Sequence, residues 1–462
     1  MVVLQSFLQG NGLPFFAVLD EQEVEQAFEA EGALFGKGKK AVYTAALSLW
    51  GLLSQVMAVG DGRTYVAAVE RIRILCLVLG IRVPSGDTGA YCRARAKIPV
   101  SVLEHLTYAV ADNLEKKIPR KWLWHNRHVK MVDGSTVMVP DTPENQAEWP
   151  QSSSQEPGLG FPIIRLCAVF SLATGALCGL ADGPCKGKET GETAMLRALF
   201  DRLNRGDILL GDRYFCSYFM IALLKDRGVD IVFRQHQRRM TDFRTGERLD
   251  VKDHIARWSK PDRPPWMDQA TYDDLPAELA VREFEIPVTT PGFRPKKIIV
   301  VTTLTNARRY SKKDLGDLYR NRWSVEVDLR SLKIHLHMED PRGQSPDQIR
   351  RELWASCLAY NLIRTTMAQA AKRHRRRIRK ISFSGAKQAI TSAFETASTA
   401  DGELLKTLAE SKFESIARRK VGHRPNRVEP RAIKRRPKKQ KLLTTPRKQA
   451  RRALLKSSHS AA

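Results

Sequence analysis

The stretch from Val129 to Arg234 alternates between strand-like and helix-like segments, and this order restricts the chain to few architectures. Apolar runs typical of strands come first and are joined by tight turns. Two segments with helical spacing of apolar residues follow, and each leads directly into a further apolar run. In chain order, the segments are 129–139, 163–172, 176–180, 192–203, 208–210, 215–227 and 229–234. Alternation of this kind predicts a parallel sheet covered by helices, which is the α/β class.

Residues 1–125 precede this stretch, and within them the segments 41–59 and 65–79 are apolar with few helix breakers. We interpret residues 1–125 as a helical N-terminal domain that binds DNA. The segment Gly89–Pro99 within it carries three basic side chains beside Tyr91. This pattern indicates either a contact to a DNA backbone or a solvated basic helix face.

Residues 126–371 form the predicted α/β domain. Within it, residues 235–297 are polar and rich in proline until a strand-like pattern returns, so we interpret them as a mostly β insertion. Two helices are expected after the insertion, at 311–336 and 345–371. Residues 372–462 are predicted to form a basic C-terminal region that is partly disordered.

The charge of the chain identifies its expected partner. The chain has 77 Lys and Arg against 50 Asp and Glu, a net charge of +27. Between Arg418 and Arg452 there are sixteen basic residues and one acidic residue, a composition that cannot bury a core. An excess of this size repels itself unless it faces a polyanion, so nucleic acid is the expected partner.

Two classes of protein are disfavoured. No stretch approaches the roughly 18 uninterrupted apolar residues of a membrane span, and the first residues do not have the pattern of an export signal. The seven cysteines include no C-x-x-C pair, which argues against a zinc site or a disulfide framework.

The segment Tyr319–Lys333 places four functional side chains on one helix stripe. At about 100° per residue, Tyr319, Arg322, Glu326 and Lys333 fall within about 60° of one another, beside a row of leucines and a valine that packs inward. Asp328 lies about 160° from Glu326 and faces away. A surface row of ion pairs is the alternative interpretation of this stripe.

Two aspartates upstream complete a candidate site. Asp133 follows the apolar run 129–132 and precedes Gly134, so its carboxylate is expected where a strand leaves the core, although an Asp-Gly hairpin turn fits equally well. Asp212 follows the run 208–211, at the carboxyl end of a predicted parallel strand, where α/β sheets place functional groups. A helix N-cap is the alternative for Asp212.

The segments around Asp133, Asp212 and Glu326 resemble the three catalytic blocks of the insertion sequence 4 family of DDE transposases. The spacing Y-x2-R-x3-E-x6-K at Tyr319–Lys333 is similar to the signature of that family. Segments PGLGFPIIRL, GKETGETAML and WASCLAYNLIR extend the resemblance to roughly residues 40–370.

The resemblance implies an RNase H-like catalytic domain interrupted by a mostly β insertion, and 114 positions between Asp212 and Glu326 leave room for one. Asp133, Asp212 and Glu326 would be the catalytic residues and the ligands of two Mg²⁺ ions about 4 Å apart, with Mn²⁺ as an alternative. Tyr319, Arg322 and Lys333 would bind DNA.

The implied function is metal-dependent cleavage at the ends of an insertion sequence and strand transfer into target DNA, by a cut-and-paste route. The partners would be the terminal inverted repeats and the target DNA, bound by a homodimer in the bacterial cytoplasm, in association with the nucleoid. Some members of the family hold a flipped base with an aromatic residue of the insertion, for which Trp258 and Trp266 are candidates matched by no motif.

Two other functions remain open at this point. A catalytically inactive or domesticated transposase would keep the basic surface and bind DNA without cutting it. An RNase H-like RNA-processing nuclease would use the same metal chemistry on another duplex.

Overall fold

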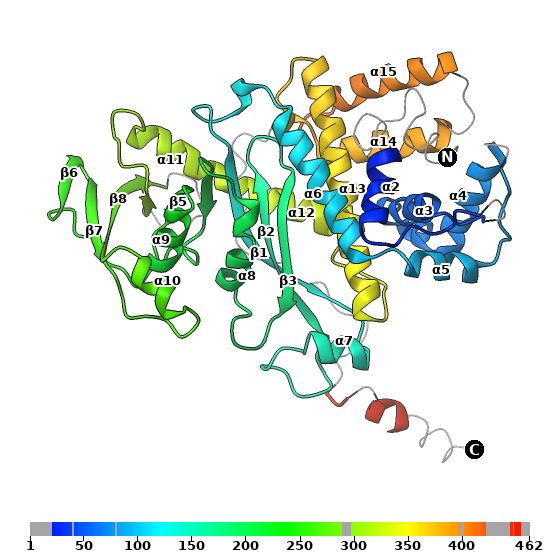
Figure 1. The fold of residues 1–462 in the computed structure, drawn as a ribbon, viewed down its shortest axis with the longest axis horizontal. Coiled ribbons are helices and arrows are strands. Elements are labelled where there is room, and N and C mark those ends of the chain that lie inside the picture. The colour runs from blue at the N-terminus through cyan, green and yellow to red at the C-terminus, as the bar shows by residue number, and fades with distance from the viewer. Residues whose placement is uncertain are drawn as a thin grey trace.

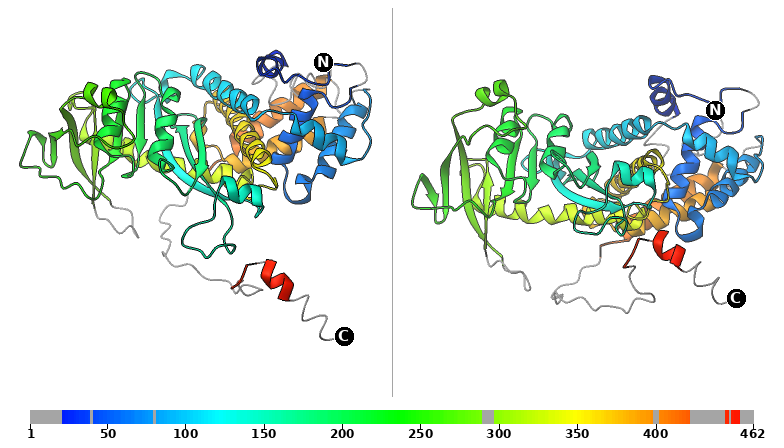
Figure 2. Two further views of the ribbon diagram at one scale, coloured as in Figure 1. Left: turned by 60° about the horizontal axis from the view of Figure 1, so that its bottom comes forward. Right: turned by 90° about the horizontal axis from the view of Figure 1, so that it is seen from below.

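The computed structural model describes residues 21–38, 41–78, 81–288, 297–397, 402–421, 444–446 and 448–453. The molecule is elongated, with a β-rich end and a helical end (Figure 1). Two further views show the same division, with the N-terminal helices far from the strands of residues 247–287 (Figure 2).

A sheet of nine strands forms the β-rich half of the molecule, and the strands lie in the order β3-β2-β1-β4-β5-β9-β8-β7-β6. The strands are β1 (Val129–Met138), β2 (Ile163–Ser171), β3 (Leu177–Pro184), β4 (Ile208–Gly211), β5 (Asp230–Arg234), β6 (Glu247–Asp250), β7 (Asp253–Ser259), β8 (Glu278–Pro287) and β9 (Lys297–Thr302). The predicted parallel pairing is confirmed for β1 with β4 and for β4 with β5. All other pairs in the sheet are antiparallel, so the sheet is mixed.

Strands at the centre of the sheet are covered on both faces. Every residue of β4 is buried, as are six consecutive residues of β2 from Leu166. Helix α8 (Glu192–Ala198) packs against β1, β2 and β3, whereas α12 (Ser324–Arg330) packs against β1 and β2. Continuous apolar runs are expected for strands with two covered faces, and this explains why the sequence showed no alternation there.

The segment expected to be an insertion is rich in strands. Residues 235–297 contain β6, β7, β8 and the short helix α10 (Gln269–Asp274). These strands extend the main sheet, because β8 pairs with β9 and β9 pairs with β5. The extension has a buried ion pair of its own, in which the Arg282 guanidinium donates to both carboxylate oxygens of Asp253.

Helices make up the other half of the molecule. The helices before the sheet are α2 (Glu21–Ala30), α3 (Ala45–Met57), α4 (Tyr65–Val78), α5 (Thr88–Ala96) and α6 (Val100–Lys116). Those after it are α11 (Lys312–Arg320), α13 (Pro346–Arg373), α14 (Phe383–Ala397) and α15 (Gly402–Arg418), and short helices α7 (Pro143–Glu148) and α9 (Tyr218–Asp226) lie within the sheet segment. Helix α13 packs against α3, α6, α14 and α15, so it is the central element of the helical half (Figure 1).

The basic C-terminal region is more ordered than expected at its beginning. Helix α13 continues through the basic residues to Arg373, and α14 and α15 follow it. Buried apolar side chains in the segment Ile378–Ile390 hold this part on α13, and most of this segment lies after Lys380, where the dense run of basic residues ends. The predicted disorder between Arg418 and Arg452 falls largely outside the described residues.

Within the described residues, no helix is both long and apolar enough to cross a membrane. All seven cysteines are free thiols.

Candidate active site

Asp133 lies within strand β1, opposite Ala168 of β2. The strand continues through Gly134 to Met138, so the hairpin turn considered for Asp-Gly is wrong. The four residues before Asp133 are buried and Asp133 is half-buried, so its carboxylate lies where the strand leaves the core, as expected. Pairing of β1 with the shorter strand β4 stops at Met131. Asp133 therefore lies two residues beyond Met131, the last residue of β1 that pairs with β4.

Asp212 follows the last residue of β4, as predicted. Its Oδ1 atom accepts a hydrogen bond from the backbone N–H of Tyr214 at 2.7 Å, which fixes a turn at the strand end. The N-cap of the next helix is Ser217, whose side chain accepts from Met220. The helix-cap interpretation of Asp212 is therefore wrong.

The third segment is helical over 312–335 but not uniform. Helix α11 is followed by a 3-10 turn at Asn321–Trp323, then α12, then a π-helical turn at Ser331–His335. The 3-10 turn winds more tightly than an α-helix and the π turn less tightly, so the two deviations partly offset each other. The predicted stripe survives, because three of its four side chains contact β1 or each other.

Arg322 links two of the carboxylates. Its Nη2 atom donates to Glu326 Oε1 at 3.0 Å, and its Nη1 atom lies 3.6 Å from Asp133 Oδ2. Lys333 donates from Nζ to the carbonyl oxygen of Thr136 at 3.1 Å, three residues beyond Asp133 on the same strand. The stripe thus faces β1 over the length of the candidate site.

Tyr319 lies deeper than the stripe suggested. Its side chain is 7% exposed, and burial raises the pKa of its hydroxyl to about 12. The charges of Arg322 and Arg234 oppose this rise, whereas that of Asp212 adds to it, so the phenol lies among these residues. A buried ring offers no free face for stacking on a base.

Asp328 points away from the site, as the helix geometry predicted. It is fully buried, and its carboxylate accepts hydrogen bonds from Arg364 of α13 and Arg379. This ion cluster fixes α12 on the helical half of the molecule.

Glu192 is a site residue that the sequence interpretation missed. It begins α8, and a Cβ atom added at Gly134 would overlap its carboxyl group, so this carboxylate lies directly over the β1 backbone next to Asp133. Burial raises the pKa of Glu192, and the nearby charges of Asp133 and Asp212 raise it further. Glu192 lies in the segment GKETGETAML, which carried part of the family resemblance, and this membership could have identified it as a site residue from the sequence.

The electrostatics of Asp133 reflect this crowding. Burial raises the pKa of its carboxyl group to about 6. The Arg322 guanidinium and the Gly134 N–H lower it, whereas Asp212 and Glu326 raise it. Carboxylates whose charges act on one another in this way favour either protons or a cation.

Carboxylate oxygens are the ligands that Mg²⁺ prefers, so the donor set has the right chemistry for this ion. Among the described residues, however, no three His, Cys, Asp or Glu side chains already stand close enough together to hold a metal ion. The positive charge between Asp133 and Glu326 is supplied by Arg322 in this arrangement.

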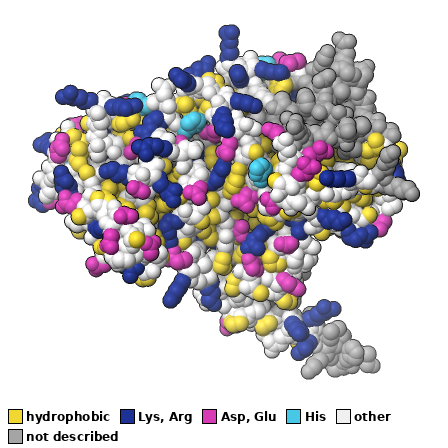
Figure 3. Space-filling view, viewed as in Figure 1, with side chains coloured by type: hydrophobic (Ala, Val, Ile, Leu, Met, Phe, Trp, Pro, Cys, Tyr) yellow, Lys and Arg dark blue, Asp and Glu magenta, His cyan; other side chains and the backbone are white. Residues whose placement is uncertain are grey.

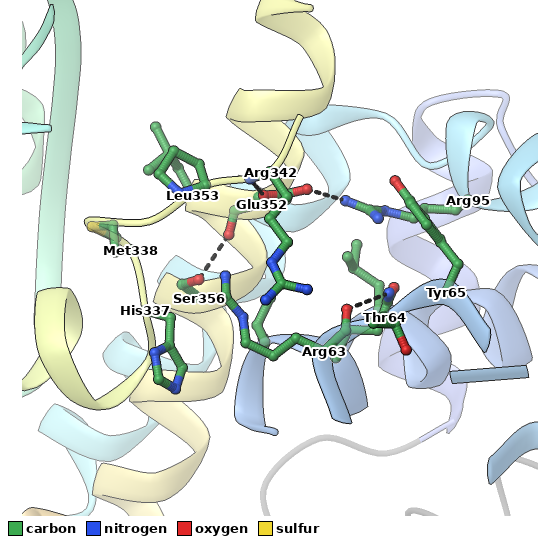
Figure 4. A pocket seen from close by; sticks show the side chains of 14 residues that line it. Arg63, Thr64, Tyr65, Arg95, His337, Met338, Arg342, Glu352, Leu353 and Ser356 are labelled. Carbon is green, nitrogen blue, oxygen red and sulfur yellow. Dashed lines mark hydrogen bonds and ion pairs between the residues drawn. The ribbon is translucent and has the colours of Figure 1, made fainter. Parts of the chain in front are cut away.

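A separate pocket of about 170 Å³ lies beside the loop that follows this helical segment. The loop that follows the π turn, α13 and the N-terminal helices line it, with Arg63, Arg95, Arg342 and Glu352 among its polar residues (Figure 4). Arg95 donates to Glu352 at 2.8 Å, and Arg63 donates to Asp340 at 3.0 Å. These pairs join the N-terminal part of the chain to α13 and to the loop that follows the π turn.

The two tryptophans of the strand-rich segment occupy different environments. Trp258 is 3% exposed and donates from Nε1 to Glu283 at 2.7 Å, so it is a core residue. Trp266 is half-buried, and the Arg197 guanidinium of α8 lies 3.8 Å from its ring centroid.

Comparison with known proteins gives this geometry a context. Residues 124–362, just over half of the chain, match the family described as the transposase DDE domain. The chain belongs to this family. The matched residues include Asp133, Glu192, Asp212 and Glu326, so every carboxylate of the candidate site lies within the DDE domain.

Individual relatives carry the same description. The chain is 27% identical over 270 residues to the transposase InsG for insertion sequence element IS4 of Escherichia coli K12, which covers 54% of this chain and 56% of InsG. It is 24% identical over 295 residues to the transposase named for insertion sequence element IS5377 of Geobacillus stearothermophilus, across 62% of this chain and 69% of the relative. The match thus spans little more than half the length of InsG, and its IS4 name agrees with the resemblance found in the sequence.

A solved structure shows a looser likeness. The cryo-EM structure of the piggyBac transposase synaptic complex with hairpin DNA aligns with a TM-score of 0.43 and 9% identity. The alignment covers 89% of this chain and 84% of that one.

Proposed function

We propose that this DDE-domain protein is a DNA transposase that cleaves the ends of an insertion sequence and transfers the freed strand into target DNA, by a cut-and-paste route. The observation that carries the proposal is the link between Asp133, Asp212 and Glu326, which come from three separate segments of the chain, through one cation and through the charges that act on Asp133. Arg322 contacts two of them, and the charge of the third acts on Asp133.

The fold we propose for residues 126–371 is an RNase H-like domain. Its support is the antiparallel set β1–β3, followed by β4 and β5 in parallel with β1, with the carboxylates where these strands end or open. Strands β6–β8 would be the insertion, because β9 returns to pair with β5 before the helix with Glu326 begins.

Asp133, Asp212 and Glu326 would hold two Mg²⁺ ions, or Mn²⁺ in their place. When bound, such ions activate a water or a 3′-OH and stabilise the leaving 3′ oxygen. Glu192 would be a fourth carboxylate in the same group, since it lies against Gly134. No covalent attachment of DNA to the protein is needed.

The cationic side chains would act on the DNA. Arg322 would exchange its carboxylates for a phosphate, because a guanidinium can bind either group through two hydrogen bonds. Lys333 would hold a neighbouring phosphate as a point charge. Tyr319 would contribute only its hydroxyl group, since its ring is buried.

The partners we propose are the terminal inverted repeats and the target DNA, bound by a homodimer. A catalytically inactive DNA-binding protein is disfavoured, because the three carboxylates and the whole Y-R-E-K set are present. An RNA-processing nuclease would be favoured instead if the protein cut an RNA–DNA hybrid faster than duplex DNA.

The test uses DNA from the flanks of the gene. A duplex that carries the flanking inverted repeat should be nicked in Mg²⁺ by the wild-type protein, and Asp133→Ala, Asp212→Ala or Glu326→Ala should each abolish nicking. Binding to the same duplex should persist in all three variants, because removal of an anion beside a phosphate does not weaken the contact. Near wild-type nicking by any one of the variants would overturn the assignment.

A further inference from the structure

Two exposed basic segments lie at the C-terminal ends of α6 and α13. Residues 116–121 begin with the last residue of α6 and expose the neighbours Lys116 and Lys117 and, on a short helical turn, Arg120 and Lys121. Residues 372–377 begin with the last two residues of α13 and expose every side chain, and five of the six are Lys or Arg. We call the exposed Lys and Arg of 116–121 and 372–377 the far-edge surface.

The fold brings these segments together. Lys117 and Lys372 line the same hollow of about 150 Å³ between α6 and α13. Glu115, just before the first segment, accepts from Thr174 at 2.6 Å, and Arg379, just after the second, donates to the carbonyl oxygen of Leu172 at 2.7 Å. Both segments are therefore tied to the turn between β2 and β3.

This turn lies at the end of the sheet where β1 begins, and the candidate active site lies further along that strand. Ser171 at the turn pairs with Lys130, at the beginning of β1, whereas the strand runs from there toward Asp133 and on to Met138. The C-terminal ends of α6 and α13 lie along the upper rim of the molecule in Figure 1, and Lys and Arg side chains project from that rim in Figure 3.

The charges of this surface are mostly uncompensated. Arg373 pairs with Glu410 of α15 at 2.6 Å, but in the described part of the chain no ion pair joins Lys117, Lys121, Arg375 or Arg377 to an acidic side chain. Like charges fixed this close together repel one another, and a polyanion removes that cost. A row of cations on two rigid helix ends has the chemistry that tracks a phosphate backbone.

We propose that the far-edge surface binds the backbone of duplex DNA at a place separate from the scissile phosphate. The proposal rests on the proposed function, since it assigns a second contact to the same DNA-processing protein. The duplex is either the inward continuation of the cleaved end or a second DNA molecule, and both present the same phosphates.

The experiment removes four charges from the surface. The variant Lys117→Ala, Lys121→Ala, Arg375→Ala, Arg377→Ala is compared with wild-type protein for binding to a 40-base-pair duplex of random sequence at several salt concentrations. If each side chain contacts one phosphate, the slope of log K against log salt falls by about 3 to 4. Binding is measured in EDTA, where no cleavage takes place, so failure of the proposed transposition chemistry leaves this comparison intact.

The matched control removes the same number of charges elsewhere. Lys225, Arg238, Arg248 and Arg257 are exposed on other parts of the described structure. Their joint replacement by Ala should change the slope by less than one, and both variants should melt at the wild-type temperature. A wild-type slope in the far-edge variant, or an equal fall in the control, would overturn the proposal.

A two-colour version separates the two sources of DNA. Protein is first saturated with one labelled 40-base-pair duplex, and a second label is then added. Capture of the second duplex by wild-type protein and not by the far-edge variant assigns the surface to a separate DNA molecule. If the far-edge variant instead binds less of the first duplex and no other difference is seen, the surface binds the inward continuation of the cleaved end.

Discussion

The Nη1 atom of Arg322 lies 3.6 Å from Oδ2 of Asp133, and this approach joins the helical segment of the candidate site to strand β1. The same guanidinium donates to Glu326 at 3.0 Å, and its side chain is only 17% exposed. One cation therefore holds two carboxylates that are proposed to bind metal ions. A metal ion would compete with Arg322 for the two carboxylates, and a DNA phosphate would compete with the carboxylates for Arg322.

Replacement of Arg322 by Ala should separate metal binding from cleavage. Two unit charges about 4 Å apart interact by about 1 kcal/mol in water and by about 4 kcal/mol at an effective dielectric constant of 20, so loss of this cation should tighten Mn²⁺ binding to the DNA-free protein by about tenfold or more. Nicking of end DNA should fall by about a hundredfold, because a phosphate is no longer held in place. Calorimetry of Mn²⁺ binding and single-turnover nicking measure the two effects.

Arg320→Ala is the matched control for this variant. Arg320 lies two residues away, is about half exposed and pairs with Asp317 at 2.6 Å. Its loss should leave both measurements unchanged. Weaker Mn²⁺ binding in Arg322→Ala would show that the guanidinium supports the carboxylates instead of competing for them.

Glu326 and Asp328 should fail in different ways. Glu326→Gln should abolish nicking and keep the melting temperature, because its side chain is partly exposed and pairs only with Arg322. Asp328→Asn should lose about 3 to 5 kcal/mol of folding free energy, since it leaves buried Arg364 without its counter-charge. Below its own melting temperature, Asp328→Asn should nick within a few-fold of wild type.

Both variants are compared by thermal melting and by single-turnover nicking at saturating Mg²⁺. Retained nicking in Glu326→Gln, together with a stable but inactive Asp328→Asn, would contradict the geometry of the helical stripe.

Glu192 and Glu189 offer a similar contrast three residues apart. Glu192→Gln should weaken Mn²⁺ binding by about tenfold, the lower end of the effects seen for groups that support a metal site, and should slow nicking. Glu189 is 52% exposed and pairs with Arg197, so Glu189→Gln should leave both properties unchanged. Gly134→Ala should imitate the loss of Glu192, because the added methyl group displaces its carboxylate. Equal Mn²⁺ affinity in Glu192→Gln and wild type would exclude it from the site.

The sequence was sufficient for the features that depend on local periodicity. It predicted the strands β1, β2, β4 and β5 and the opposite faces of Glu326 and Asp328. It also predicted a parallel sheet, which the structure confirms only for the pairs β1–β4 and β4–β5. The short strand β4 could be found because both of its faces are buried, which makes it an uninterrupted apolar run.

Features that depend on tertiary contacts were not predictable in this way. The local sequence does not show why position 134 of β1 requires glycine, because that need comes from Glu192, which is distant in the sequence. The burial of Tyr319 and the antiparallel return of β9 to β5 also depend on partners outside their own segments. The catalytic roles of these residues stay predictions until variants are measured.

The pKa of Asp133 leads to a prediction about folding stability with a definite sign. Its value of about 6 lies above the ordinary 3.8, mainly because of burial, so the folded protein binds this proton more tightly than the unfolded chain does. The stabilisation from the bound proton is fully present below pH 3.8 and is lost as the pH rises through about 6. In EDTA, Asp133→Asn should therefore be more stable than wild type by about 3 kcal/mol at pH 8 and nearly equal to it near pH 4. The Asn carbonyl oxygen can still accept the Gly134 N–H, so only the charge changes.

Urea unfolding at both pH values measures this difference in stability between Asp133→Asn and wild type. The control is the variant Asp262→Asn at an exposed position, for which no pH dependence is expected. With Mg²⁺ at pH 8 the order should reverse, because only wild type gains from metal binding to the folded state. The same stability difference at pH 4 and pH 8 would show that the Asp133 carboxylate is not destabilised by its surroundings.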